Sequence, residues 1–123
     1  EWSYQSDNGR SMVYTSNEQG NMLGYTCDGD GFCVVLFDTD MSCKSGSSYP
    51  MKMTVTGESD VSGSYDIQAQ CVNETGTFAL MNNGEPVGNR GLFYGWGWIL
   101  EINEKPYVFN VSKARDPLAK MIR

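Results

Sequence analysis

The 123-residue chain contains no histidine, and this absence excludes several classes of enzyme. A serine–histidine–aspartate triad, a cysteine–histidine pair and a histidine-ligated metal all need the imidazole group. The glycine-rich loops that bind nucleotide phosphates are also missing, so we expect no cofactor and no metal. A hydrolase that uses two carboxylates stays open, because the chain has 15 aspartate and glutamate residues.

Long apolar runs are absent as well. No run approaches the roughly 18 residues of a membrane-spanning helix, so we expect no transmembrane segment. The chain begins at Glu1 without an initiator methionine or a signal-like stretch, and we expect a mature or trimmed product. A hydrophobic fraction of 40% is sufficient for one packed core, which favours a single secreted domain over residues 1–123.

Cysteine is scarce, with four residues in total: Cys27, Cys33, Cys43 and Cys71. None of the gaps has the Cys-x-x-Cys spacing of a zinc knuckle or a redox motif. The even number favours two disulfides formed in an oxidising compartment, hence a periplasmic or extracellular location. We prefer the pairs Cys27–Cys33 and Cys43–Cys71, although four cysteines permit three pairings.

The stretch YTCDGDGFC, residues 25–33, allows three interpretations. A redox motif needs a closer spacing of its cysteines, and an EF-hand loop counted from Asp28 would need glycine where Cys33 stands. A disulfide-stapled hairpin fits better, because Asp-Gly favours tight turns and the two cysteines flank the loop. A separate oxygen cluster for a cation stays open, made of Asp28, Asp30, Asp38 and Asp40.

The net charge of −6 is distributed unevenly. Residues 1–104 have a balance of −10, whereas residues 105–123 have a balance of +4. An acidic body repels the phosphates of nucleic acids, so we expect no nucleic-acid partner. A cationic protein partner fits this charge better, and a role in solubility alone is the alternative.

Strands dominate the predicted secondary structure. Apolar and polar residues alternate with the period of a half-buried strand at 51–56, 66–71, 96–102 and 107–111, and the apolar run 33–37 predicts a central strand. Glycine- and asparagine-rich turns lie between the runs, at 8–9, 18–21, 28–31, 45–48, 82–84 and 88–91. Short strands with frequent turns predict an antiparallel β-sandwich or barrel.

The tryptophan-rich strand carries the candidate binding surface. Alternation places four residues on one face: Trp96, Trp98, Leu100 and Ile102. Gly95 and Gly97 predict a bent or bulged strand whose bare face lies against another element, or else a close ligand. Such an aromatic cluster more often lies in the core. Because aromatic residues are enriched at binding hot spots, it is also our candidate partner-binding surface if part of it is exposed: Phe93, Tyr94, Trp96 and Trp98.

The end of the chain changes to a helical period. One helix face would carry Ala114, Leu118, Met121 and Ile122. Asp116 before Pro117 predicts an N-cap followed by proline at the first helical position. We expect a short C-terminal helix laid on the sheet, with Lys120 and Arg123 near its end. Its basic side chains would be solvated, or alternatively would contact an anion or a membrane.

Two glycosylation sequons occur, at Asn73-Glu-Thr75 and Asn110-Val-Ser112. They are relevant only in a eukaryotic secretory pathway, and such triplets also arise by chance. Asn110 lies in a predicted strand, which is a poorer acceptor position than a loop.

The layout resembles that of small bacterial periplasmic proteins of the invasion-associated locus B type. The matching features are Trp2, YTC at 25–27 with a second cysteine soon after, WILEI at 98–102, and YVFNV at 107–111 before a short apolar helix. This resemblance implies a secreted β-sandwich. It supplies no catalytic residues.

Two segments are similar to the periplasmic inhibitors of C-type lysozyme. YTCDG at 25–29 looks like that family's opening Tyr-x-Cys strand, and VSGSY at 61–65 is similar to its Ser-Gly-x-x-Tyr loop, one residue shorter. In that family the loop serine enters the lysozyme active site. The resemblance assigns this role to Ser62 or Ser64, next to Tyr65, and an ordinary turn is the alternative.

The sequence thus predicts a mainly β fold, an antiparallel β-sandwich or barrel with a short C-terminal helix and two disulfides. The function that we expect is non-enzymatic binding of a protein partner outside the cytoplasm. Two alternatives stay open. One is inhibition of a cationic hydrolase such as C-type lysozyme, and the other is a carboxylate-dependent hydrolase.

Overall fold

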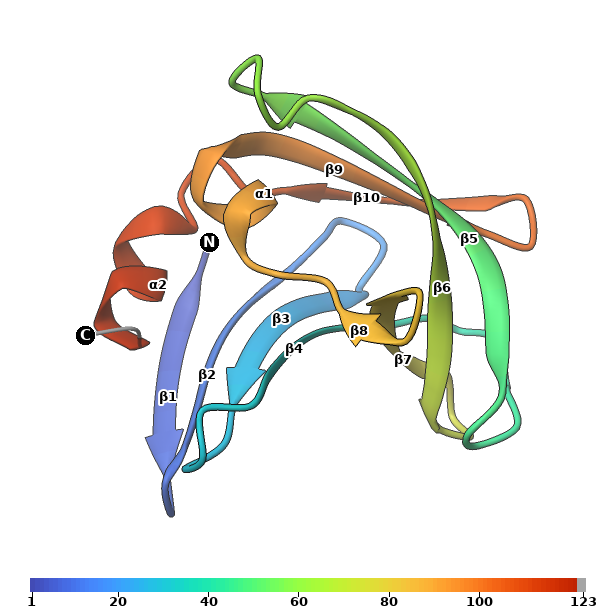
Figure 1. The fold of residues 1–123 in the computed structure, drawn as a ribbon, viewed down its shortest axis with the longest axis horizontal. Coiled ribbons are helices and arrows are strands. Elements are labelled where there is room, and N and C mark those ends of the chain that lie inside the picture. Colours follow the sequence, from blue (N-terminus) through green and yellow to red (C-terminus); the bar gives the residue numbers. More distant parts are fainter. Residues whose placement is uncertain (122–123) are drawn as a thin grey trace.

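The computed structural model describes residues 1–121, which form one antiparallel sheet and two short helices (Figure 1). The strands are β1 (Ser3–Asp7), β2 (Arg10–Ser16), β3 (Met22–Cys27), β4 (Cys33–Asp38), β5 (Ser48–Gly57), β6 (Gly63–Asn73), β7 (Thr77–Asn82), β8 (Glu85–Pro86), β9 (Gly95–Ile102) and β10 (Lys105–Asn110). The helices are α1 (Arg90–Tyr94) and α2 (Arg115–Met121).

The sheet has the strand order β1-β2-β3-β4-β7-β6-β5-β9-β10, with β8 paired to β7. It curls so that β1–β4 face β5, β6, β9 and β10 across the interior (Figure 1). The order begins at β1 and ends at β10, and these two strands are not hydrogen-bonded neighbours. The fold is therefore an open barrel with a seam between its first strands and β10, and the predicted fold class is confirmed.

Two-residue turns join three of the strand pairs. Both central residues have positive φ in Asn8–Gly9 (51° and 77°), Asn83–Gly84 (53° and 85°) and Asn103–Glu104 (56° and 66°). This is the type I′ turn, whose twist matches that of the paired strands. The turns expected at 8–9 and 82–84 are confirmed. The turn at 103–104 was not predicted, because Glu104 replaces the usual glycine.

Alternation correctly predicts the buried faces of most strands. Met53, Ile67 and Tyr107 are 5%, 4% and 0% exposed, at positions where the period of two places them inside. The ring of Phe37 lies 5.8 Å from that of Phe78 and 5.9 Å from that of Tyr107, measured between centroids. Since Phe37 is on β4 and Tyr107 on β10, this contact joins the two halves of the sheet through the core.

Both preferred disulfides are present, Cys27–Cys33 and Cys43–Cys71. Cys27 stands directly opposite Cys33 in the β3–β4 ladder. The Asp28 carboxylate accepts hydrogen bonds from the backbone N–H groups of Asp30 and Phe32, at 2.9 and 3.0 Å. The stretch YTCDGDGFC is therefore a stapled hairpin, as its turn chemistry predicts.

The start of the C-terminal helix differs from the prediction. Leu118 N–H donates to the Ala114 carbonyl, at 3.0 Å, so Ala114 and not Asp116 occupies the N-cap position. Ala114 is fully buried, and its packing sets where the helix begins, while Asp116 lies in the first turn and complements the helix dipole. Ile122 and Arg123, which the prediction included, lie outside the described residues.

The turn expected at 88–91 is only partly correct. Arg90 and Gly91 begin the short helix α1, in which Leu92 and Phe93 N–H groups both donate to the Asn89 carbonyl. Leu92 is fully buried. Its packing in the core stabilises this short helix, although glycines precede and follow it in the sequence.

Candidate binding site at the open seam

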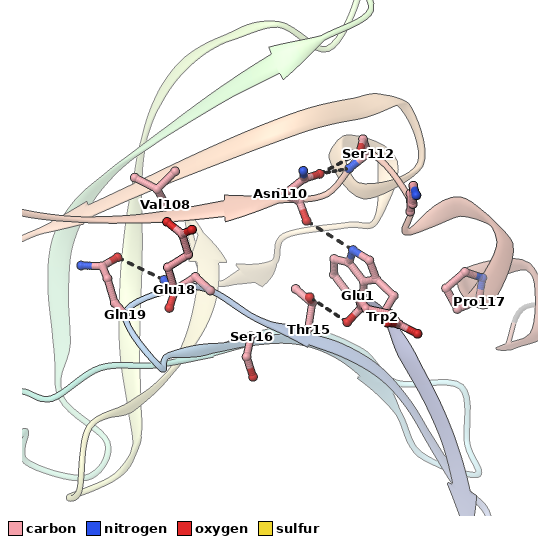
Figure 2. A pocket seen from close by; sticks show the side chains of 12 residues that line it. Glu1, Trp2, Thr15, Ser16, Glu18, Gln19, Val108, Asn110, Ser112 and Pro117 are labelled. Carbon is pink, nitrogen blue, oxygen red and sulfur yellow. Dashed lines mark hydrogen bonds between the residues drawn. The ribbon is translucent and has the colours of Figure 1, made fainter.

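The N-terminal residues join the two sides of the seam at one point. The indole Nε1–H of Trp2 donates to the Asn110 carbonyl at 3.3 Å, and the Thr15 hydroxyl donates to the Glu1 carbonyl at 3.0 Å (Figure 2). Trp2 is half-buried and packs against the hydrophobic core. The segment before β1 is thus anchored to both β2 and β10.

A groove of about 1060 Å³ lies along the seam. Its lining residues are Glu1, Trp2, Thr15, Ser16, Asn17, Glu18, Gln19, Val108, Asn110, Ser112, Lys113 and Pro117. The end of β2 and the following loop form one wall, and β10 forms the other (Figure 2). Its volume is slightly above the range of about 300–1,000 Å³ that is common for ligand pockets.

Hydrogen bonds hold the loop that forms the first wall. Asn17 N–H donates to the Asn21 carbonyl at 2.9 Å, and the Asn17 side-chain oxygen accepts from Asn21 N–H at 2.8 Å. The Asn17 amide also donates to the Gln19 side chain at 3.1 Å. This network orders the loop and leaves the Glu18 side chain exposed at the groove.

The second wall presents an apolar surface to solvent. Val108 on β10 is 54% exposed and stands opposite Ile99 on β9, which is 40% exposed. Sequence reasoning did not select Val108. The signal was present, because the buried residues Tyr107 and Phe109 on either side require Val108 to point outward.

The two sequon asparagines have the same local geometry. The side-chain oxygen of Asn110 accepts from the N–H and hydroxyl of Ser112, at 2.9 and 2.7 Å. The corresponding distances from Thr75 to Asn73 are both 2.9 Å. These short-range bonds terminate β10 and β6 at the asparagines, and they place Asn110 at the groove.

The structure separates the two tryptophans of β9. Trp98 is fully buried, and its indole N–H donates to the Gly91 carbonyl at 3.1 Å, whereas Trp96 is 59% exposed. The prediction that they share a face is wrong, because a bulge interrupts the ladder: Thr56 pairs with Gly97 and Gly57 with Gly95. Trp96 is the extra residue of this bulge and turns outward.

Gly95 explains why the bulge forms here. A Cβ atom at this position would lie 2.1 Å from the Gly91 carbonyl oxygen, so only glycine allows the backbones of α1 and β9 to approach. The expectation of a bulged strand with its bare face against another element is confirmed. Trp98, placed in the candidate binding cluster, is a core residue instead.

The other two members of the aromatic cluster are half-buried. The guanidinium groups of Arg90 and Arg115 lie over the Tyr94 ring, 5.5 and 4.9 Å from its centroid. Arg90 also pairs with Asp60. The rings of Phe93 and Tyr94 lie 6.1 Å apart between centroids and are tilted by 40°. These cation–π contacts cover Tyr94 and leave Trp96 as the most exposed member of the cluster.

The loop that resembles the lysozyme-inhibitor motif closes the β5–β6 hairpin. The Ser62 hydroxyl oxygen accepts from Gly57 N–H at 3.0 Å and lies 2.8 Å from the Gly57 carbonyl. The Ser64 hydroxyl pairs with that of Thr54 at 3.1 Å, and the Tyr65 hydroxyl donates to the Val61 carbonyl at 3.0 Å. All three selected residues thus bond within their own hairpin.

A second hollow, of about 700 Å³, lies beside this hairpin. Val61 and Tyr65 contribute to its lining, together with the inward-facing side chains of Met53, Val55 and Ile67. These three residues are only 3–5% exposed, and the half-buried Pro86 and Val87 also line the hollow. The seam groove is the larger of the two cavities.

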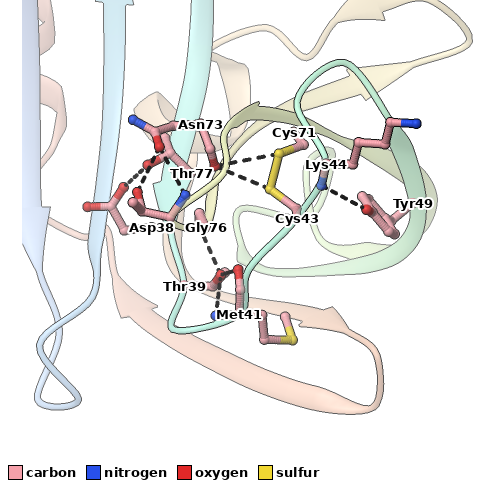
Figure 3. Close-up of a disulfide and its surroundings, with 11 residues drawn as sticks. Asp38, Thr39, Met41, Cys43, Lys44, Tyr49, Cys71, Asn73, Gly76 and Thr77 are labelled. Carbon is pink, nitrogen blue, oxygen red and sulfur yellow. Dashed lines mark hydrogen bonds between the residues drawn. A yellow bond between two sulfur atoms is a disulfide. The ribbon is translucent and has the colours of Figure 1, made fainter.

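Three of the four aspartates of the proposed cation cluster have separate roles. Asp28 caps its own turn, and the Asp38 carboxylate accepts from the Thr77 hydroxyl at 2.9 Å (Figure 3). Asp40 accepts from Lys105 Nζ at 2.8 and 2.6 Å. Within residues 1–121, no three acidic or cysteine side chains are placed to hold a metal ion.

The Asp40 site also bears on the hydrolase alternative. Hydrogen bonds from Lys105, and then from the Tyr107 hydroxyl at 2.8 Å, hold the pKa of Asp40 below its usual value of 3.8. A general acid needs a pKa raised toward neutrality, which is the opposite direction. In the groove, Glu18 lies at the Val108 end and Glu1 toward Pro117 (Figure 2).

The Cys43–Cys71 disulfide fixes the segment that carries Asp40. Figure 3 shows this connection beside the turn at Gly76. Thr39 N–H donates to the Gly76 carbonyl at 2.7 Å, and Cys43 N–H donates to the Glu74 carbonyl at 3.2 Å. The segment is thereby held against the β6–β7 turn, and it brings Asp40 to the start of β10.

No protein-family model, no curated protein and no solved structure matches this chain. Between residues 1 and 121, neither helix has the length and apolar character needed to cross a membrane.

Proposed function

We propose that this protein is a non-enzymatic protein-binding module that acts outside the cytoplasm and binds a cationic partner at the seam groove. The observation that carries the proposal is the groove itself, which is bounded by the ordered loop at Glu18 and by the exposed Val108. Because the walls of the groove are already ordered, less conformational entropy is lost when a partner binds.

The disulfides and the charge support this proposal. Disulfides form and persist in oxidising compartments. One disulfide links the two strands of the β3–β4 hairpin, and the other links the β4–β5 connection to β6. The net charge of −6 attracts a cationic protein and accelerates its encounter. Binding should therefore weaken as the salt concentration rises.

The test begins with capture of proteins from secreted or envelope extract by the oxidised protein, at low and moderate salt. Each captured protein is identified, purified and titrated against the Val108→Glu and Val72→Glu variants. Val72 is the matched control, because it is a strand valine that is 51% exposed and lies outside the groove. The proposal predicts that Val108→Glu loses the partner and that Val72→Glu keeps it.

C-type lysozyme belongs among the purified test proteins. Lysozyme inhibition that survives Val108→Glu and is lost in Ser62→Ala would favour the inhibitor alternative and contradict the groove. Equal binding of all partners by both valine variants would also contradict it. Hydrolysis of a glycan by the purified protein, lost when Glu18 is changed to Gln, would favour the carboxylate hydrolase.

A further inference from the structure

The β9–β10 hairpin determines which backbone groups of β10 bond to β9. The two-residue type I′ turn Asn103–Glu104 makes its flanking residues, Ile102 and Lys105, a hydrogen-bonded pair. In an antiparallel ladder such pairs alternate with non-hydrogen-bonded pairs. Tyr107 and Phe109 therefore direct their N–H and C=O groups toward β9.

The remaining residues of β10 direct their backbone groups the other way, toward the seam. These residues are Pro106, Val108 and Asn110, and the last two line the groove. The hydrogen bond from the Trp2 indole to the Asn110 carbonyl has this direction. Pro106 has no N–H to offer, so Val108 is the centre of the outward-facing edge.

The facing wall is also an incomplete edge. The β1–β2 ladder ends where Ser3 pairs with Tyr14, and β2 continues to Ser16. The groove thus lies between the end of β2 and the edge of β10, where the curled sheet is not closed by strand pairing. Exposed strand edges pair readily with another extended chain.

We infer that the groove binds an extended basic segment of the partner as an added strand, antiparallel to β10 and paired at Val108. This inference rests on the proposed protein-binding function. All neighbouring strands of the sheet are antiparallel, so an antiparallel segment continues the same pattern. Main-chain hydrogen bonds supply affinity in this mode of recognition, and alternate side chains supply specificity.

The side chains along the groove define the segment. A residue paired with Val108 lies on the same face as Val108 and Ile99, so a β-branched apolar side chain extends that exposed apolar pair. Glu18 lies at the Val108 end of the groove (Figure 2), whereas Lys113, which also lines the groove, follows the end of β10 at Asn110. For an antiparallel segment, these charges place the basic residues at its C-terminal end.

The probe is an eight-residue peptide, blocked at both ends, in which threonine alternates with valine before two C-terminal lysines. Two further peptides carry backbone N-methyl groups, one on the valines and one on the threonines. Because the valines pair with β10, methylation of the valines should abolish binding, and methylation of the threonines should leave it unchanged. Equal binding of both methylated peptides would overturn the inference.

Protein variants give a second, independent test by isothermal titration. Val108→Pro removes the N–H group that points toward the groove, and no hydrogen bond between β9 and β10 is lost because this N–H makes none. The variant should bind the unmethylated peptide about tenfold more weakly, which corresponds to the loss of one strong hydrogen bond. Ser6→Pro, a substitution on the exposed strand β1, is the control and should have no effect. A peptide with two glutamates in place of the lysines should bind more weakly than the basic peptide.

The two proposals fail in different ways. Absence of binding by the basic peptide, or wild-type affinity in a folded Val108→Pro variant, would overturn strand addition. The capture experiment with Val108→Glu and Val72→Glu would still decide whether the groove binds a protein. If the basic peptide does not bind, and Val108→Glu also retains every captured protein, the groove is not a binding site.

Discussion

The indole of Trp2 donates a hydrogen bond to the backbone carbonyl of Asn110, which lies 108 positions further along the chain. This contact joins the beginning of the chain to the end of the last strand. Beyond it the seam is open, and the groove begins. The contact therefore sets where the barrel is closed and where a partner can enter.

Substitution of Trp2 should destabilise the protein. Trp2→Ala removes a half-buried ring and its hydrogen bond, and should lower the free energy of unfolding by about 1–2 kcal/mol. Trp2→Phe retains most of the packing and should cost less than Trp2→Ala. Urea denaturation at neutral pH measures both values. Identical unfolding midpoints for the wild type and Trp2→Ala would show that the seam contact does not stabilise the fold.

The two tryptophans of β9 should respond in opposite ways to substitution. Trp98→Phe leaves a cavity and an unpaired Gly91 carbonyl in a fully buried site, and should cost about 2–3 kcal/mol. Trp96→Ala alters an exposed bulge residue and should change stability by less than about 0.5 kcal/mol. Thermal unfolding measures the stability of both variants. A larger decrease in unfolding temperature for Trp96→Ala than for Trp98→Phe would refute the bulge.

The disulfides should contribute unequally to stability. Cys43 and Cys71 are separated by 28 positions and Cys27 and Cys33 by six, so a chain-entropy estimate gives about 3.6 and about 2.2 kcal/mol. The double alanine variant of the first pair should therefore unfold at lower urea concentration than that of the second. The reverse order would mean that loop closure does not dominate their effect.

The Asp40–Lys105 contact predicts a dependence of stability on acid. The folded-state pKa of Asp40 is lowered, so its contribution to stability is present above its unfolded-state pKa and is lost as pH falls through the folded-state value. Between about pH 5 and pH 2.5, the wild type should lose more stability than Asp40→Asn. Asp66→Asn, an exposed acid on β6, is the control. Equal losses in wild type and Asp40→Asn would contradict this contribution.

Local pattern predicted much of this fold. The alternation around Met53 and Ile67 identified their buried faces, and the turn chemistry of Asp28 identified the stapled hairpin. The exposure of Trp96 could not be predicted in this way, because the bulge depends on Gly57 and Gly95, which meet only in the folded sheet. A period-two pattern assumes an uninterrupted ladder.

The candidate site was harder to predict than the fold. The outward position of Val108 follows from alternation, but its place beside a groove depends on how the whole sheet curls. No local sequence pattern indicates that β10 is the last strand of the sheet or that Glu18 lies across the groove from β10. Aromatic enrichment selected Trp98 instead, which packing has placed in the core.

Amide hydrogen exchange at β10 tests the central claim most directly. If β10 presents a free edge to the groove, the Val108 amide should exchange quickly in the free protein, while the amides of Tyr107 and Phe109 exchange slowly. Addition of the basic peptide should slow exchange at Val108 and leave its two neighbours unchanged. A Val108 amide that is already protected in the free protein, or that stays unprotected in the peptide complex, would contradict the account.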